Sequence, residues 1–272
     1  HNQKTYIGQY NNKIILPLFE YFGQNIAEII FTKKYALSSS TQINVDDVEL
    51  ISPIPNPHSM RDAYAFRQHV EFSRKNRGLD MIPEYDKFPV YYYSNHSNIM
   101  GPGKINVMGK HSNKLDFELE IAIVIGKKGT NIKAQHADEH ILGYMLMNDW
   151  SARAIQMEEM KLNLGPAKGK DFATSLGPFL VTRDELKKYL IPTKNGEKYN
   201  LEMSCKVNDI TVSTDNMKNM TWTFAEIIEQ ISYGTTIYPG DVIGSGTCAT
   251  GCFLELNYGN ENTQWLKDGD QI

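Results

Sequence analysis

Two glutamates, Glu118 and Glu120, alternate with apolar residues in a stretch rich in β-branched side chains, residues 116–126. This composition predicts a β-strand, in which successive side chains point to opposite faces. The two carboxylates therefore share a face, roughly 6.5–7 Å apart, and repel each other unless a cation or a proton intervenes. Mg²⁺ and Ca²⁺ prefer carboxylate oxygens, so the pair could hold such an ion. A strand with one face in water would show the same pattern.

A third carboxylate, Asp149, ends an apolar run about thirty residues further on. The segment after it places Trp150, Arg153 and Gln156 at three-residue spacing, which puts Arg153 and Gln156 on one side of a helical turn. A carboxylate at the end of a buried strand could complete an oxygen cage with Glu118 and Glu120.

Three segments together resemble the fumarylacetoacetate hydrolase family in their order, their spacing and several intervening residues. They are Asp116-Phe-Glu-Leu-Glu120, Met147-Asn-Asp-Trp-Ser-Ala-Arg153 with Gln156, and Gly169-Lys170. The resemblance implies that Glu118, Glu120 and Asp149 hold a catalytic Mg²⁺, with Ca²⁺ or Mn²⁺ as the other candidates.

A further segment, residues 62–69, matches the fumarylacetoacetase pattern Asp-x-Tyr-x-x-Arg-Gln-His. The match implies that Asp62 is a fourth metal ligand, that Tyr64 lines the substrate pocket and that His69 is the general base. An isolated histidine on a helix is more often a surface or core residue, so this role rests on the resemblance.

The same resemblance implies roles for further side chains. Tyr92 would line the substrate pocket, and Thr247 would bind a substrate carboxylate. Glu255 would orient His69 and raise its basicity. Lys170 would be the pocket lysine and, with Arg153 and Gln156, would donate hydrogen bonds to developing negative charge.

Periodicity alone supports a mixed, strand-rich α/β chain. The resemblance implies a β-roll or sandwich with peripheral helices, usually assembled as a homodimer. Three prolines at positions 53, 55 and 57 favour an extended connector. We therefore expect a small N-terminal region over residues 1–55 and a catalytic domain over residues 56–272.

Local patterns predict several elements. Helices are expected from near Asp62 to the glycine at position 78, over 132–142, over 183–190 and over 222–232, and a strand over 252–257. The segment 199–212 predicts a hairpin that turns at Asn208 and Asp209. His136 and His140 have the i, i+4 spacing of a zinc pair, but a solvated helix face explains them better.

The composition excludes several classes of partner. The formal net charge is −4 without a basic stripe, which argues against nucleic acid. No apolar run approaches the roughly 20 residues that span a membrane. Cys248 and Cys252 could form half of a zinc site but lack a second ligand pair, so the three cysteines predict reduced core thiols and a cytoplasmic setting. No signal peptide is visible, although the first residue is His1, so the chain could be a processed form or a fragment.

These residues predict a metal-dependent hydrolase that cleaves a carbon–carbon bond in a 1,3-diketo or acylpyruvate-type acid, a small-molecule keto-acid substrate. Met160 and Ala154 stand where fumarylacetoacetases carry a tyrosine and an aspartate, which favours a smaller acid than fumarylacetoacetate. One alternative is a 2-oxo acid lyase or isomerase, such as an oxaloacetate decarboxylase, which needs no attacking water. Another is a non-catalytic metal-binding protein, which would need no base with an orienting partner.

Overall fold

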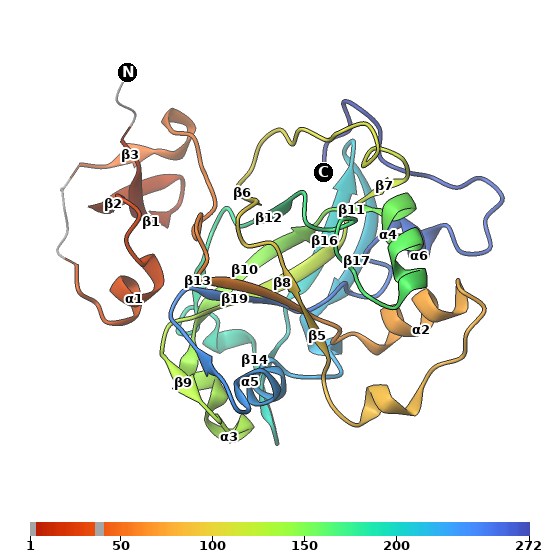
Figure 1. Ribbon diagram of the computed structural model, residues 1–272. Helices are drawn as coiled ribbons and strands as arrows, with labels where there is room; N and C mark the ends of the chain where they lie inside the picture. Colours follow the sequence, from red (N-terminus) through yellow and green to blue (C-terminus); the bar gives the residue numbers. More distant parts are fainter. Residues whose placement is uncertain (1–3, 36–40) are drawn as a thin grey trace.

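A computed structural model describes residues 4–35 and 41–272, and a curled central sheet forms its core (Figure 1). The sheet has eight strands in the order β5-β4-β19-β8-β10-β12-β6, and β13 also pairs with β10. Their bounds are β4 Ser59–Ala63, β5 Tyr91–Ser94, β6 Ile99–Met100, β8 Leu119–Ile125, β10 Ile141–Asp149, β12 Thr174–Leu176, β13 Val181–Thr182 and β19 Asp241–Gly244. This strand-rich α/β architecture confirms the predicted fold class.

The first part of the chain forms a small unit of its own beside this sheet (Figure 1). It contains the antiparallel strands β1 (Tyr6–Asn11), β2 (Ile14–Glu20) and β3 (Ile43–Asn44), with helix α1 (Ile26–Phe31). Asn25 caps α1 by accepting a hydrogen bond from the Glu28 N–H. The expected N-terminal region also includes residues 1–3 and 36–40, which lie outside the described residues.

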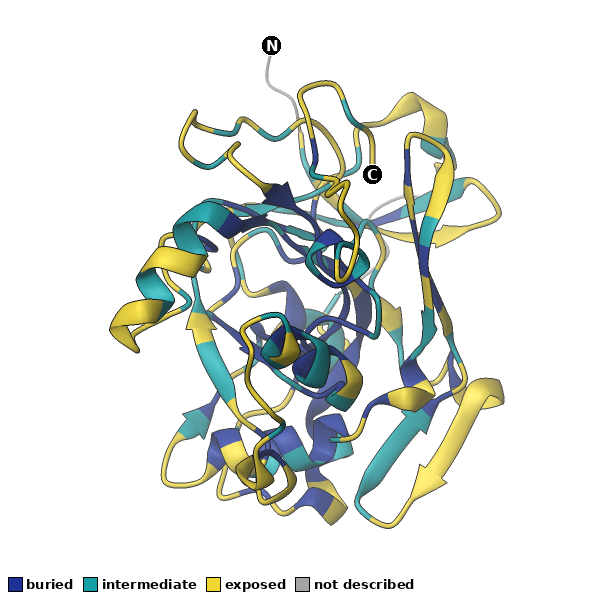
Figure 2. Ribbon diagram, turned by 90° about the vertical axis from the view of Figure 1, so that its right-hand side faces the viewer, coloured by how far each residue is buried: buried dark blue, intermediate teal, exposed yellow. Residues whose placement is uncertain are grey.

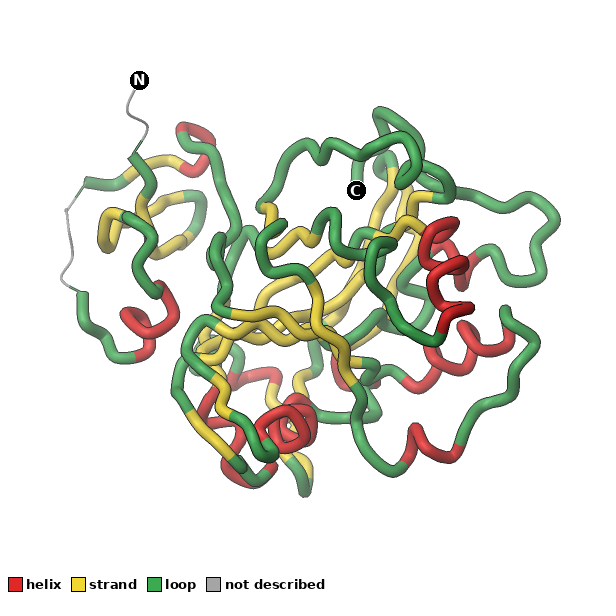
Figure 3. Tube along the Cα trace, in the orientation of Figure 1, coloured by secondary structure: helices red, strands yellow, loops and turns green. Residues whose placement is uncertain are grey.

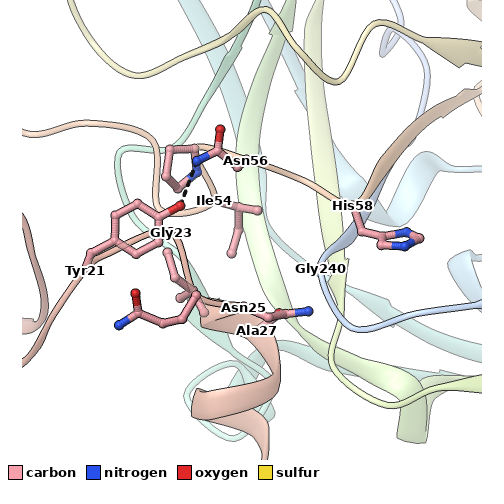
Figure 4. A pocket seen from close by; sticks show the side chains of 11 residues that line it. Tyr21, Gly23, Asn25, Ala27, Ile54, Asn56, His58 and Gly240 are labelled. Carbon is pink, nitrogen blue, oxygen red and sulfur yellow. Dashed lines mark hydrogen bonds between the residues drawn. The ribbon is translucent and has the colours of Figure 1, made fainter.

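A cavity of about 180 Å³ lies where this unit meets the main body (Figure 4). Tyr21, Asn25 and Ala27 line it from one side, and Ile54, Asn56 and His58 line it from the connector. The Asn56 amide donates a hydrogen bond of 2.7 Å to the Tyr21 hydroxyl. No predicted site residue lines this cavity, so it is separate from the expected chemistry.

Four two-stranded ribbons complete the β-structure of the described residues. They are β7 (Leu115–Asp116) with β11 (Ser151–Ala152), β9 (Gly129–Thr130) with β18 (Thr236–Ile237), β14 (Leu190–Thr193) with β15 (Gly196–Tyr199), and β16 (Glu202–Val207) with β17 (Ile210–Asn216). The last pair is the predicted hairpin, and Asn208 and Asp209 take the positive φ values, 51° and 65°, that its tight turn requires.

Short helices lie around the strands (Figure 3). The α-helices are α2 (Arg67–Lys75), α3 (Ala134–Ala137), α4 (Arg153–Glu159), α5 (Phe224–Ser232) and α6 (Phe253–Leu256). The 3-10 helices are Val45–Asp47, Pro83–Asp86, Asp138–His140, Met160–Leu162, Lys187–Tyr189 and Met217–Asn219. Among the residues described, no helix is long and apolar enough to cross a membrane.

The alternation of β8 fills both sides of the sheet. Phe117, Leu119, Ile121 and Ile123 belong to one apolar core, whereas Ala122 and Val124 belong to the other. Helix α5 packs Phe224, Ile227 and Ile228 into the first core, as its helical spacing predicts. Figure 2 shows the central strands as buried and the outer loops as exposed.

Four local predictions were wrong. Asp62 lies in β4, and the following helix begins only at Arg67. Residues 253–256, expected as a strand, form α6 because the Asp116 carboxylate accepts hydrogen bonds from its first N–H groups. The expected helix over 132–142 ends at His140 because β10 begins at Ile141, and that over 183–190 is reduced to Lys187–Tyr189.

Candidate active site

The four predicted metal ligands meet at one end of the sheet. Asp62 comes from β4, Glu118 immediately precedes β8, Glu120 lies within β8, and Asp149 ends β10. Each side chain can offer one oxygen such that all four atoms lie within 4.8 Å of one another, and all four residues are buried. The structure therefore brings together carboxylates that are 87 positions apart at the extremes (149 − 62).

Two glycines, Gly244 at the end of β19 and Gly246 just after it, make room for these carboxylates. The Gly246 N–H is 3.0 Å from both Asp62 Oδ1 and Glu120 Oε2. Gly246 has a φ of +79°, which disfavours any residue with a Cβ. At Gly244 a Cβ would lie 2.4 Å from Asp62 Oδ1. Thr247, the predicted carboxylate-binding residue, is buried in the same segment.

Two carboxylate oxygens in this cluster have no hydrogen-bond partner within residues 4–35 and 41–272. They are Glu120 Oε1 and Asp149 Oδ1, and both are buried. Burial, with the charges of Asp62, Glu118 and Asp149, raises the pKa of Glu120 well above its usual range. Burial and the charge of Asp149 likewise raise the pKa of Asp62 to about 7. Free, mutually repelling oxygens of this kind fit a hard divalent cation such as Mg²⁺, Mn²⁺ or Ca²⁺.

Lys170 and Tyr92, the predicted pocket lysine and substrate-lining tyrosine, lie against the carboxylate cluster. The Lys170 ammonium donates to Asp149 Oδ2 at 2.7 Å and also contacts Glu118 Oε2. The Tyr92 hydroxyl donates to the same Asp149 oxygen at 2.7 Å. Burial alone would raise the pKa of Glu118, but Lys170, Arg153 and His69 outweigh it and lower this pKa to about 2. Glu118 is thus the carboxylate held ionised by neighbouring cations.

His69 and Glu255 form a buried pair between helices α2 and α6. His69 Nδ1 is hydrogen-bonded to Glu255 Oε1, while Glu255 Oε2 accepts a hydrogen bond of 3.0 Å from the Thr250 N–H. The other ring nitrogen, Nε2, lies 3.4 Å from the Ser73 hydroxyl. The Tyr64 ring meets the imidazole edge-on, with centroids 5.6 Å apart. A carboxylate at Nδ1 fixes the tautomer and leaves Nε2 as the basic nitrogen.

Arg153 is buried, with hydrogen bonds from two guanidinium nitrogens and an ion-pair contact from the third. Nε donates to Asp116 Oδ2 at 2.8 Å, Nη2 lies 2.8 Å from Glu118 Oε1, and Nη1 donates to Gln156 Oε1 at 2.9 Å. Sequence reasoning missed Asp116. Its signal was available, because it shares the alternation of Glu118 and Glu120 in Asp-x-Glu-x-Glu.

The histidines at positions 136 and 140 do not form a zinc pair. His136 is exposed, whereas His140 is buried and its Nδ1 lies 2.8 Å from the Lys127 carbonyl oxygen. All three cysteines are buried and free, as their spacing predicted.

The family model for the fumarylacetoacetate (FAA) hydrolase C-terminal domain matches residues 59–272. The chain belongs to the fumarylacetoacetate hydrolase family. Its curated relatives include fumarylacetoacetase of Oryza sativa, which is 29% identical over 90% of this chain and 69% of that protein. Human mitochondrial oxaloacetate tautomerase FAHD2A is 34% identical over 68% of this chain and 55% of that protein. The chain thus spans between just over half and about two thirds of their lengths.

Solved structures of this family share the fold. A 5-carboxymethyl-2-hydroxymuconate delta-isomerase from Mycobacterium smegmatis has a TM-score of 0.67 at 24% identity, covering 97% of this chain and 87% of that one. Fumarylpyruvate hydrolase from Pseudomonas aeruginosa, solved with Mn²⁺ and pyruvate, has a TM-score of 0.60 at 17% identity, covering 86% and 85%. The sequence relatives thus include a hydrolase and a tautomerase, and the two solved structures show that the fold is shared.

Proposed function

We propose that this protein is a metal-dependent hydrolase that cleaves a carbon–carbon bond in an acylpyruvate or related 1,3-diketo acid. The observation that carries the proposal is the buried His69–Glu255 pair beside four clustered carboxylates. Hydrolysis needs an attacking water, and water needs a base whose free nitrogen is oriented by a partner. The Pseudomonas aeruginosa relative is a fumarylpyruvate hydrolase that binds Mn²⁺ and pyruvate, and this agrees with the proposed chemistry.

Asp62, Glu118, Glu120 and Asp149 would hold the ion, and Mg²⁺ is our first candidate. A bound divalent ion would polarise a substrate oxygen and stabilise negative charge that develops there. Within this four-carboxylate cluster, Glu120 Oε1 and Asp149 Oδ1 are buried oxygens that have no hydrogen bond to give up among the residues described. The carboxylates would thus supply a preorganised anionic site for the cation, and a small keto acid with adjacent oxygens would bind to that cation.

His69 would carry out the proton transfers of the reaction, with Glu255 as its partner. His69 Nε2 would take a proton from water, while Glu255 at Nδ1 stabilises the resulting imidazolium. The hydroxide would add to the distal carbonyl carbon, and the bond from that carbon to the pyruvyl methylene would break with its electrons on the methylene. His69 would then transfer its proton to the methylene carbon. The products are pyruvate and a carboxylic acid. Lys170, Arg153 and Gln156 would stabilise the negative charge along this path.

Tyr64, Tyr92 and Thr247 would complete the walls of the pocket. Tyr64 packs on His69, and Tyr92 bonds to Asp149, so both are held next to the reacting groups. Met160 and Ala154 remove two polar side chains that fumarylacetoacetases carry, and we therefore favour a smaller acylpyruvate as the substrate. We expect a homodimer that works in the cytoplasm without nucleic acid or membrane partners.

A 2-oxo acid lyase or isomerase is the second candidate. The identity of 34% to human oxaloacetate tautomerase favours it, because such a reaction uses the same metal and a base but no attacking water. Proton NMR of the Mg²⁺- or Mn²⁺-loaded protein with acylpyruvates, fumarylacetoacetate and oxaloacetate separates the two. We expect equal amounts of pyruvate and carboxylic acid from an acylpyruvate. Pyruvate from oxaloacetate alone, or enol–keto exchange without cleavage, would identify the second candidate instead.

His69→Ala is the matching variant for this assay. Loss of a general base typically lowers kcat about 10²–10⁴-fold, and we expect a loss in that range for acylpyruvate cleavage. His136→Ala, at an exposed histidine, is the control and should keep the wild-type rate. Cleavage that survives His69→Ala undiminished would contradict the proposed water activation.

A further inference from the structure

Cys252 lies beside the His69–Glu255 pair and has no part in the proposed reaction. Its Sγ is 3.8 Å from Glu255 Oε1, the same oxygen that bonds His69 Nδ1. A nitrogen of His69, the thiol sulfur and a Glu255 oxygen all lie within 4.8 Å of one another. The three residues His69, Cys252 and Glu255 are 4%, 0% and 5% exposed, so they face one another inside the protein.

The backbone holds these three groups in place. Cys252 is the N-cap of α6 and Glu255 lies three residues later, so both side chains project from the first turn of that helix. His69 faces them from α2, which is joined to α6 by the hydrogen bond of 3.0 Å from the Asn76 amide to the Leu254 carbonyl. The edge-on contact of the Phe72 and Tyr258 rings adds to this packing. The two helices are therefore in direct contact.

We propose that Cys252, His69 and Glu255 form a second metal site, which takes a thiophilic divalent ion such as Zn²⁺ and thereby switches the enzyme off. Imidazole nitrogen, thiolate sulfur and carboxylate oxygen are the three ligand types that Zn²⁺ uses, and sites with three protein ligands and one open position are common. Mg²⁺ is a hard ion that avoids sulfur, so it selects the four-carboxylate site instead.

The charge of such a complex suits a buried position. Coordination deprotonates a thiol outright, and the proton leaves to solvent. One thiolate and one carboxylate then balance the charge of Zn²⁺, while His69 binds as the neutral imidazole. The site would therefore hold no net charge, which avoids the cost of burying an unpaired ion.

Occupation of this site would block the proposed reaction. The ligand atoms of a tetrahedral zinc site stand further apart than two hydrogen-bonded atoms, so the His69–Glu255 hydrogen bond must open. The ring nitrogen and the carboxylate would then be committed to the ion, and His69 would lose the partner that makes it a base. Excess Mg²⁺ would not relieve this inhibition, because the two ions occupy different sites.

The inhibition arm of the test rests on the proposed function. With Mg²⁺ saturating, Zn²⁺ is titrated against acylpyruvate turnover, and each variant is compared with its own uninhibited rate. In Cys252→Ser the half-inhibiting concentration of Zn²⁺ should rise at least about tenfold, since even outer-shell changes cost about 10–100-fold in metal affinity. Cys248→Ser, at a second buried cysteine, is the matched control and should be inhibited like the wild type. Equal inhibition of Cys252→Ser and wild type overturns the proposal.

A spectroscopic arm does not need turnover. Co²⁺ added to the Mg²⁺-loaded protein should give a near-ultraviolet thiolate-to-cobalt charge-transfer band. The double variant Cys205→Ser/Cys248→Ser retains Cys252 as the single cysteine of the sequence, and it should keep this band without any change at the site. Absence of the band from folded wild-type protein overturns the proposal. A band without acylpyruvate cleavage would leave this site standing and remove only the proposed function.

Discussion

Asp116 and Glu120 are both fully buried carboxylates on the same face of one segment, yet their surroundings are opposite. Asp116 accepts four hydrogen bonds, from the N–H groups of Phe117, Phe253 and Leu254 and from Arg153 Nε. Glu120 accepts one, from Gly246, and its Oε1 has no partner in the part of the chain that the structure describes. We call Asp116 the closed carboxylate, because both of its oxygens accept hydrogen bonds, and Glu120 the open carboxylate, because one of its oxygens has no partner among the described residues.

This difference in hydrogen bonding distinguishes a carboxylate that stabilises the fold from one that could bind a cation. The closed carboxylate begins helix α6 and fixes Arg153, and so it positions Glu255 and Gln156. The open carboxylate stabilises nothing comparable: burial raises the pKa of both carboxyl groups, but at Glu120 the charges of Asp62, Glu118 and Asp149 raise it further, whereas at Asp116 the charge of Arg153 opposes the rise. Buried polar groups are normally satisfied, so an unsatisfied oxygen among three other carboxylates indicates a place for a cation.

Removing the open carboxylate should give the largest effect on activity. Glu120→Gln should lower metal-dependent turnover by about 10³-fold, since Lewis-acid stabilisation contributes several kcal/mol. The metal-free variant should melt at or above the wild-type temperature at pH 7, because a costly buried charge is gone. Mg²⁺ or Mn²⁺ should raise the Tm of the wild type but not of this variant. A large loss of metal-free stability would break the comparison.

Removing the closed carboxylate should act on stability instead. Asp116→Asn removes one of the two carboxylates paired with Arg153, and breaking a buried ion pair typically costs about 3–5 kcal/mol. Urea unfolding of the metal-free protein should show this loss. Glu120→Gln is the matched control, since it makes the same carboxylate-to-amide change on the same face. Equal free energies of unfolding for Asp116→Asn and Glu120→Gln would contradict the view that only the closed carboxylate stabilises the fold.

Among the described residues, Asp138 is another carboxylate with an unpartnered buried oxygen, and its replacement should have a smaller effect on stability. Asp138 accepts from the Glu197 N–H at 3.1 Å, and its Oδ1 is buried without a partner among the described residues. Burial, followed by the charge of Glu197, raises its pKa to about 6 from an ordinary 3.8. The folded protein therefore binds this proton more tightly, and ionisation of Asp138 costs stability as the pH rises from about 4 through 6.

Asp138→Asn should accordingly stabilise the protein by about 1–2 kcal/mol at pH 7.5, less than the full linkage value because the site is partly solvated. The gain should vanish below about pH 4, where Asp138 is neutral in both states. Thermal unfolding across about pH 3.5–8 measures this, with exposed Asp268→Asn as the control. A gain that also depended on Mg²⁺ would contradict the view that an open carboxylate needs three companions to hold an ion.

Much of this site could be predicted from the sequence. The alternation around Glu118 and Glu120 indicated the strand and its faces, because period-two patterning is local. The apolar run ending at Asp149 indicated the third carboxylate of the cluster. Asp62, His69 and Lys170 could be assigned to the site only through the family resemblance. Asp62 reaches the other carboxylates because β4 pairs with β19, and no local sequence pattern predicts this long-range pairing.

The errors have the same origin. Residues 253–256 carry a strand-like apolar pattern, but the N–H groups of Phe253 and Leu254 are satisfied by Asp116, which is 137 positions away from the first of them. Four residues are too few to form a stable helix by propensity, so only this distant carboxylate decides the conformation. The alternation Asp-x-Glu-x-Glu marks Asp116 as a residue of interest, but nothing local shows that it caps a helix instead of binding a metal ion.

Gly244 and Gly246 have a consequence for how the enzyme could acquire new substrates. A side chain at the first would collide with Asp62, and one at the second would have to adopt a φ of +79° with its Cβ 2.5 Å from the Ala63 carbonyl oxygen. Substitutions at Gly244 and Gly246 should therefore be poorly tolerated. Diversification must come from less constrained segments, such as the one that carries Leu162 and Leu164, which are 79% and 81% exposed. A directed-evolution library for altered substrate scope should therefore spare residues 244–247 and randomise residues 157–166.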